Sequence, residues 1–114
     1  MHKYQELEVW KRSMDLSESI YLLSDNFPSD EKFGLTSQIR RAAISVPSNI
    51  AEGAGRNSNG EFRQFIGISM GSLFELETQL LLAFRFRYLN EVDKELKSID
   101  SLRKMLFGLQ KSLN

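Results

Sequence analysis

The chain has 114 residues, 41% of them hydrophobic, and it balances 15 Lys and Arg against 15 Asp and Glu. This length fits one domain over residues 1–114, and the zero net charge removes the uniform positive field that attracts nucleic acid. Without cysteine, the chain has no disulfide, thiolate metal site or cysteine nucleophile. Residues 1–6 lack a signal-peptide pattern, and the apolar run at residues 80–84 is too short to cross a bilayer, so we expect a cytoplasmic protein without a membrane partner.

The first predicted helix runs from about Glu6 to Asp25. Apolar side chains recur near helical spacing between charged ones, from Leu7 and Trp10 to Leu23. The turn at Phe27 and Pro28 ends this helix, because the residue before a proline is pushed out of the helical conformation.

The second predicted helix begins between Ser29 and Leu35 and reaches about Ala54. Its apolar stripe consists of Leu35, Ile39, Ala42, Val46 and Ile50. Pro47 lies inside this helix, where it removes one backbone hydrogen bond and clashes with the preceding turn, so we expect a kink there. Glycines at positions 53 and 55 then end the helix.

The third predicted helix runs from about Ser58 to Leu89, and the fourth from about Glu91 to Leu113. Ser58 and Glu61 have the spacing of a capping box, in which the serine hydroxyl accepts a hydrogen bond from the Glu61 amide. Four antiparallel helices with short connections predict an all-α, up-down-up-down four-helix bundle.

The third helix is apolar around more of its circumference than one bundle can bury. Phe74, Leu81 and Leu82 lie outside its main apolar stripe. A helix of this kind is typically covered on more than one side, so these three residues are our candidate subunit interface. Scattered apolar surface, which is common on soluble proteins, is the alternative.

Polar residues also follow one face of the second helix, and part of the third helix can face them. If facing positions in this hairpin sum to roughly 115, Arg41 comes level with Glu75 and Glu52 comes level with Arg63. We expect two interhelical ion pairs, Arg41 with Glu75 and Glu52 with Arg63, that fix the alignment of the hairpin. Separate, solvated charges are the alternative.

This face offers little for catalysis. Glu52 and Glu75 are about three turns apart, and no histidine, cysteine or lysine accompanies them. The Glu-x-x-His pairs of di-metal bundles are absent, as is a phosphate-binding loop. We therefore expect no catalytic, cofactor-binding or metal-binding residue, no cofactor and no small-molecule substrate.

Binding of nucleic acid is a separate hypothesis. Arg40, Arg41, Arg56 and Arg63 lie on or near the hairpin of the second and third helices, and residues 84–88 interleave aromatic and basic side chains, as stacking surfaces do. On a helix Phe84 and Tyr88 share a face from which Arg85 points away, so core packing explains these aromatics as well.

Several of these residues together resemble a known family. They are Trp10, the Phe27-Pro28 turn, Leu35-Thr36-x-Gln38-Ile39-Arg40-Arg41-Ala42, Ser45-Val46-Pro47-Ser48-Asn49-Ile50-Ala51-Glu52-Gly53, Arg56 and Gly71-Ser72-x-x-Glu75-Leu76-Glu77. The chain resembles the bacterial four-helix-bundle proteins encoded by intervening sequences within 23S ribosomal RNA genes. That family is related to the accessory variability protein of diversity-generating retroelements, a pentameric ring that binds nucleic acid and a reverse transcriptase.

The resemblance implies a homopentameric ring with a central channel. The retroelement protein is strongly basic, whereas this chain is neutral, which weakens the transfer of nucleic-acid binding. Our first hypothesis is therefore a non-enzymatic, homo-oligomeric scaffold or adaptor with a nucleic-acid or ribonucleoprotein partner. The alternative is a protein that binds nucleic acid directly. In both, the candidate partner surface on the second and third helices consists of Arg40, Arg41, Asn49, Glu52, Arg56 and Arg63.

Overall fold

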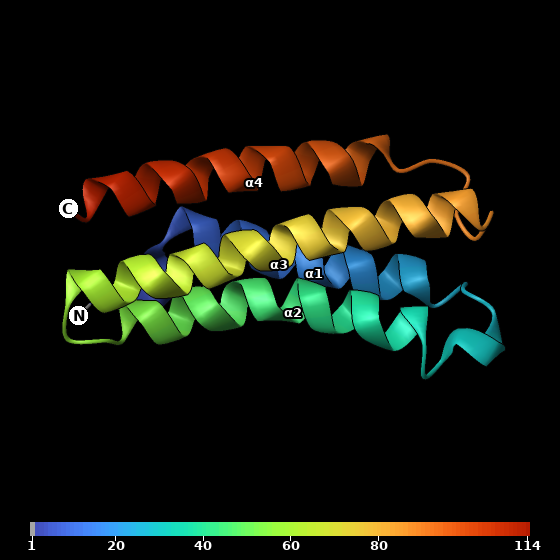
Figure 1. The fold of residues 1–114 in the computed structure, drawn as a ribbon, viewed down its shortest axis with the longest axis horizontal. Helices are drawn as coiled ribbons and strands as arrows, with labels where there is room; N and C mark the ends of the chain where they lie inside the picture. Colours follow the sequence, from blue (N-terminus) through green and yellow to red (C-terminus); the bar gives the residue numbers. More distant parts are fainter. Residues whose placement is uncertain (1) are drawn as a thin grey trace.

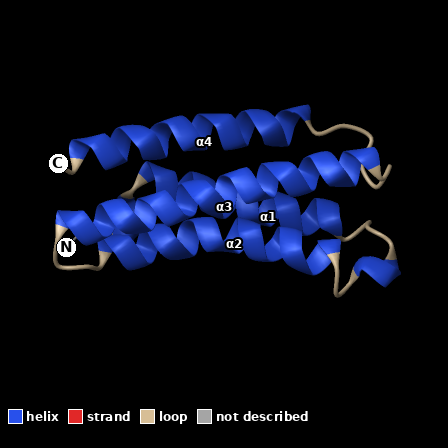
Figure 2. Cartoon of the chain, viewed as in Figure 1, coloured by secondary structure: helices blue, strands red, loops and turns tan. Residues whose placement is uncertain are grey.

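The computed structural model describes residues 2–114, which fold into four α-helices that lie side by side along a common axis (Figures 1 and 2). The helices are α1 (Glu8–Ser24), α2 (Leu35–Ala54), α3 (Asn59–Arg85) and α4 (Asp93–Ser112). Two short 3-10 turns, η1 (Tyr4–Glu6) and η2 (Ser29–Glu31), precede α1 and α2. No strand occurs within residues 2–114, so the predicted all-α class is confirmed.

Local signals in the sequence explain where α3 begins and ends. The backbone amide of Glu61 donates to the Ser58 hydroxyl over 3.2 Å, which confirms the predicted cap. At the other end, Arg87 adopts a φ of 67°, a left-handed conformation that an α-helix cannot continue through. The helix therefore ends at Arg85 rather than at the predicted Leu89.

The four helices enclose one hydrophobic core. Each helix packs on two neighbours, in the order α1, α2, α3, α4 and back to α1. The largest side chains with no exposed surface include Phe62, Ile20, Ile39, Ile50 and Leu106. Within the described residues, α3 alone is long and apolar enough to cross a membrane, and only part of it is buried in the bundle. Helix α3 therefore has more apolar surface than the core of the bundle buries.

Pro47 lies in the middle of α2, and a side chain of α1 compensates for the backbone donor that it lacks. Proline has no N–H to donate to the carbonyl four residues earlier, which here belongs to Ala43. The Ser17 hydroxyl of α1 lies 2.9 Å from this carbonyl and 2.9 Å from the Ser13 carbonyl of its own helix, so its one proton is shared between the two acceptors. The hydrogen bond joins α1 to α2, and α2 continues through the proline to Ala54.

The α2–α3 hairpin has the predicted register. The Ser69 hydroxyl donates to the Val46 carbonyl over 3.0 Å, and these two positions sum to 115. Near the loop, a Cβ atom placed on Gly53 would lie 2.6 Å from the Cβ of Phe65. Gly53 therefore lets the two helices approach closely, a role beyond the helix end that the sequence suggested.

Both termini lie at the end of the bundle that carries the α2–α3 loop (Figure 1). The backbone amide of His2 donates to the Ala54 carbonyl over 2.8 Å, which satisfies an acceptor at the end of α2. The Arg63 guanidinium donates to the Leu113 carbonyl over 2.6 Å at the end of α4. These contacts hold the loop end against the rest of the bundle.

Candidate partner-binding surface

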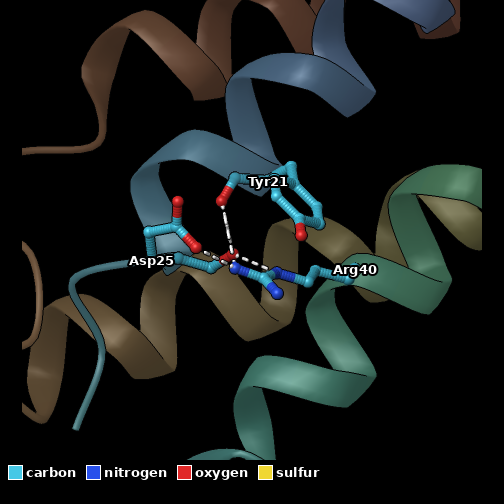
Figure 3. Close-up of polar contacts among 4 residues, drawn as sticks. Tyr21, Asp25 and Arg40 are labelled. Atoms are coloured by element: carbon cyan, nitrogen blue, oxygen red, sulfur yellow. Dashed lines mark hydrogen bonds and ion pairs between the residues drawn. The ribbon is translucent and has the colours of Figure 1, made fainter.

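Arg40 belongs to the structure of the bundle and faces α1. Its guanidinium donates to the Ser24 hydroxyl over 2.7 Å, to the Tyr21 carbonyl over 3.2 Å and to the Asp25 carboxylate over 2.8 Å. It also stacks 3.9 Å from the centre of the Tyr21 ring. Figure 3 shows these contacts at the end of α1. Because the guanidinium satisfies and neutralises the end of a neighbouring helix, we assign Arg40 to fold stability.

Arg41, the next residue, is exposed. Its predicted partner was Glu75. Among residues 2–114, the ion pairs within 4.0 Å do not include Arg41 with Glu75. The register brings the two positions level, but long exposed side chains need not meet across a helix seam. Arg41 remains the cation of the candidate surface with the fewest contacts inside the chain.

The second predicted pair, Glu52 with Arg63, is likewise absent from the ion pairs within 4.0 Å in the described part of the chain. Glu52 instead accepts from Arg56, four residues later in the loop after α2, over 2.7 Å. The Arg56 guanidinium also lies 4.9 Å from the centre of the Phe65 ring. Arg63 is directed toward α4, where it reaches Leu113 and where its own carbonyl accepts from Gln110 over 3.0 Å. Both arginines are thus occupied within the chain.

Asn49 belongs to a polar seam between α2 and α3. Its amide donates to the Ser45 carbonyl and hydroxyl over 2.8 and 2.9 Å, and the Ser45 hydroxyl lies 2.8 Å from that of Ser72. Further along, the side-chain oxygen of the buried Gln79 has no hydrogen-bond partner. The seam mainly ties two helices together, so it contributes less to a partner surface than the sequence suggested.

The apolar candidates on α3 lie on the surface. Phe74 is 55% exposed, Leu81 is 42% exposed and Leu82 is 38% exposed. Sequence reasoning missed Phe107, which adds an exposed aromatic ring on α4. Leu106 and Phe107 are adjacent, and consecutive residues of a helix point about 100° apart, so Phe107 lies off the apolar stripe to which Leu106 belongs; this was the signal available in the sequence.

Two larger hollows lie along the helix seams. A cleft of about 530 Å³ between α1 and α4 is lined by charges of both signs and by serines, including Arg12, Asp15, Lys97 and Ser101. A groove of about 500 Å³ between α1 and α2 is mainly apolar, with Trp10, Met14, Ile44 and Pro47 among its lining residues. We call the second hollow the α1–α2 groove. Sequence reasoning named neither hollow, because both depend on how the helices pack.

The titratable groups with shifted pKa values serve structural contacts. The Tyr88 hydroxyl donates to Glu31 over 2.7 Å and, together with the Leu35 amide, lowers the pKa of the Glu31 carboxyl. Arg103 and Lys104 lower the pKa of Asp100 on α4. Within residues 2–114, no group of three or more His, Asp or Glu side chains could hold a metal ion. These contacts connect loops and helix turns, and the two shifted carboxyl groups lie apart, with Asp100 and Lys104 in an open hollow of about 410 Å³ on α4.

Comparison with known proteins identifies a family over most of the chain. No curated protein sequence matches it significantly. The sequence profile of the family described as 23S rRNA-intervening sequence protein matches residues 5–108, nearly the full length and all but the end of α4. This span contains the Pro47 segment, the capping box and the exposed apolar residues of α3. The chain therefore belongs to the 23S rRNA-intervening sequence protein family.

Proposed function

We propose that this protein is a non-enzymatic homo-oligomer, assembled as a pentameric ring, that acts as a scaffold for a nucleic-acid or ribonucleoprotein partner. The observation that carries the proposal is the exposed apolar surface of α3 at Phe74, Leu81 and Leu82. Several large apolar side chains exposed along one helix are typical of an interaction site. A second copy of the chain would cover it and remove it from water.

The scaffold role is supported by the family of the chain and by the positions of its shifted carboxyl groups. The family is one of small helical proteins encoded within ribosomal RNA genes, and the perturbed carboxyl groups are bound to helix turns and loops. A catalytic site would need a convergent acid–base or nucleophilic cluster beside a cavity. The same family setting supports a bacterial, cytoplasmic location. As part of the ring geometry, we also infer that α2 bends at Pro47.

The mass of the protein in solution tests the proposal. Light scattering after size-exclusion chromatography should give five times the mass of one chain, and replacement of Phe74 by glutamate should lower that mass. Glutamate is a better helix former than phenylalanine, so the variant should keep its helical circular dichroism. A wild-type protein that elutes with the mass of one chain would rule out the scaffold.

Direct binding of nucleic acid has less support. Arg40, Arg56 and Arg63 make contacts inside the chain, which leaves Arg41 as the one of the four without an ion pair or side-chain hydrogen bond among residues 2–114. A ring would repeat Arg41 once per subunit, and repeated weak contacts can add up to measurable affinity. If this alternative holds, RNA or DNA should shift in a gel at low salt, and the affinity should fall steeply as salt rises. No shift even at low salt would exclude it.

A further inference from the structure

Exposed apolar residues lie along the seam of α3 and α4. Phe74 and Leu81 are seven residues apart on α3 and so share a helix face. Across the α3–α4 seam, the Arg103 guanidinium lies 5.9 Å from the centre of the Phe74 ring, and Phe107 is one turn beyond Arg103 on α4. We call Phe74, Leu81 and Phe107 the α3–α4 ridge.

Glycines beside this ridge have no explanation within the chain. A Cβ atom placed on Gly71 or on Gly108 would have no other atom within 4 Å. Glycine in a helix interior costs about 1 kcal/mol relative to alanine, so each of these residues weakens its helix. Small residues at a helix surface allow a second backbone to approach closely. Their position next to Phe74 and Phe107 is the arrangement expected of a surface that another chain covers.

The α1–α2 groove is the matching receptor on the other side of the bundle. Ile44 is 54% exposed and Met14 is 45% exposed on its apolar walls. The helices follow one another around the bundle, so the α1–α2 seam and the α3–α4 seam face in opposite directions. One chain therefore cannot place its own ridge in its own groove.

The charges beside the two surfaces are complementary. Glu18 lies exposed at the α1–α2 groove. The ridge instead has a cation at one end, because the Lys111 ammonium lies 5.8 Å from the centre of the Phe107 ring, whereas the Arg103 guanidinium beside Phe74 is paired with Asp100 over 2.6 Å. Opposite charges at the edge of an apolar contact favour one orientation and disfavour the pairing of two identical surfaces.

From these observations we infer that the subunits join head to tail, with the α3–α4 ridge of one copy seated in the α1–α2 groove of the next. A contact between two different surfaces closes into a ring when its rotation allows, whereas a two-fold dimer brings identical surfaces together. This inference rests on the proposed homo-oligomer and adds which faces of the subunits meet.

Two variants that each disable one surface test the head-to-tail contact. Ile44→Glu places a charge in the groove, and Phe74→Glu places one on the ridge. Each variant alone should have the mass of one chain, because neither can form a complete contact with itself. Mixed in equal amounts, they should form a species with twice that mass, since the intact ridge of the groove variant fits the intact groove of the ridge variant.

The control is Leu22→Glu, which changes a 62% exposed residue of α1 outside both surfaces and should leave the assembly unchanged. Met14→Glu gives a second groove variant, and circular dichroism verifies that each protein is folded. If the wild type is an oligomer but the groove variants assemble normally, or the mixture forms no dimer, the head-to-tail contact is wrong and the homo-oligomer stands. If the wild type itself has the mass of one chain, both proposals fail.

Discussion

Pro47 and Ser17 show how a single residue can compensate for another on a different helix. The proline removes a backbone donor from the interior of α2. The Ser17 hydroxyl of α1 supplies a replacement donor to the Ala43 carbonyl. A buried carbonyl left without a partner costs about 1 to 3 kcal/mol. The contact therefore makes the proline tolerable and, at the same time, aligns α1 with α2.

This compensation predicts a coupling between the two positions. Ser17→Ala should lower the free energy of unfolding by about 1 to 3 kcal/mol, because the Ala43 carbonyl loses its donor. In a Pro47→Ala background the new backbone amide can donate to Ala43, so the same serine change should cost much less. Urea unfolding of the four proteins measures this double-mutant cycle. Equal costs in both backgrounds would show that Ser17 does not act on the carbonyl released by Pro47.

Glu31 and Tyr88 make a second contact between distant residues, and it predicts a pH dependence. The folded-state pKa of Glu31 is lowered from 4.5, chiefly by the hydrogen bond from Tyr88. The ionised carboxylate therefore contributes stability above about pH 4.5, and that contribution is lost as the pH falls through the lower folded-state value.

Tyr88→Phe removes the main donor, so the pKa of Glu31 should rise toward its ordinary value in an NMR titration of the side-chain carboxyl. The difference in stability between wild type and variant should be present at neutral pH and should shrink on acidification. Tyr4→Phe is the matched control, because the Tyr4 hydroxyl has no hydrogen bond in the described structure and its loss should leave Glu31 unchanged. An unchanged Glu31 titration in Tyr88→Phe would contradict the assignment.

At the level of the helices, the close approach of α2 and α3 depends on Gly53. Replacing it by alanine puts a methyl group 2.6 Å from the Cβ of Phe65. This Cβ is bonded directly to the backbone, so a change of rotamer cannot move it out of the way. Gly53→Ala should therefore lower the free energy of unfolding by about 1 to 3 kcal/mol, as overpacking does.

Gly108→Ala is the control, because a Cβ there has open space around it. In a subunit on its own this change should raise the free energy of unfolding by about 0.5 to 1 kcal/mol through helix propensity. Thermal or urea unfolding of both variants gives the comparison. Gly53→Ala as stable as wild type would mean that the hairpin can open without loss.

The helices themselves could be predicted from the sequence, because their causes are local. Apolar periodicity, the Ser58 cap and the turn at Pro28 depend on residues close together in the chain, and the structure has four helices near the expected bounds. The ends that moved have equally local reasons, such as the left-handed Arg87 that stops α3 early. The kink at Pro47 remains a prediction, which residual dipolar couplings on either side of the proline would measure.

The partners of individual side chains could be predicted less well, because they depend on rotation and reach. The hairpin register was right, yet Glu52 pairs with Arg56 in the loop that follows α2, and Arg63 turns to the end of α4. Arg40 was assigned to a partner surface, although its contacts lie on α1, sixteen or so residues earlier in the chain. A pattern along one helix gives the faces of that helix and leaves open which neighbour each face meets.

For the whole molecule, the balance of buried and exposed apolar residues is the main result. The core is closed by residues from all four helices, while α3 and α4 still present Phe74, Leu81 and Phe107 to solvent. The opposite side of the bundle holds a mainly apolar groove. Contact between copies of the chain, with the ridge of one copy in the groove of the next, would explain both exposed apolar surfaces.

Sedimentation equilibrium of the wild-type protein over a range of concentrations is the most direct test of this account. A ring of subunits should give a mass several times that of one chain, with five copies as the expected number, and should lose that mass when Phe74 is replaced by glutamate. A mass equal to one chain at every concentration would contradict it, because the apolar ridge of α3 and α4 would then remain in contact with water.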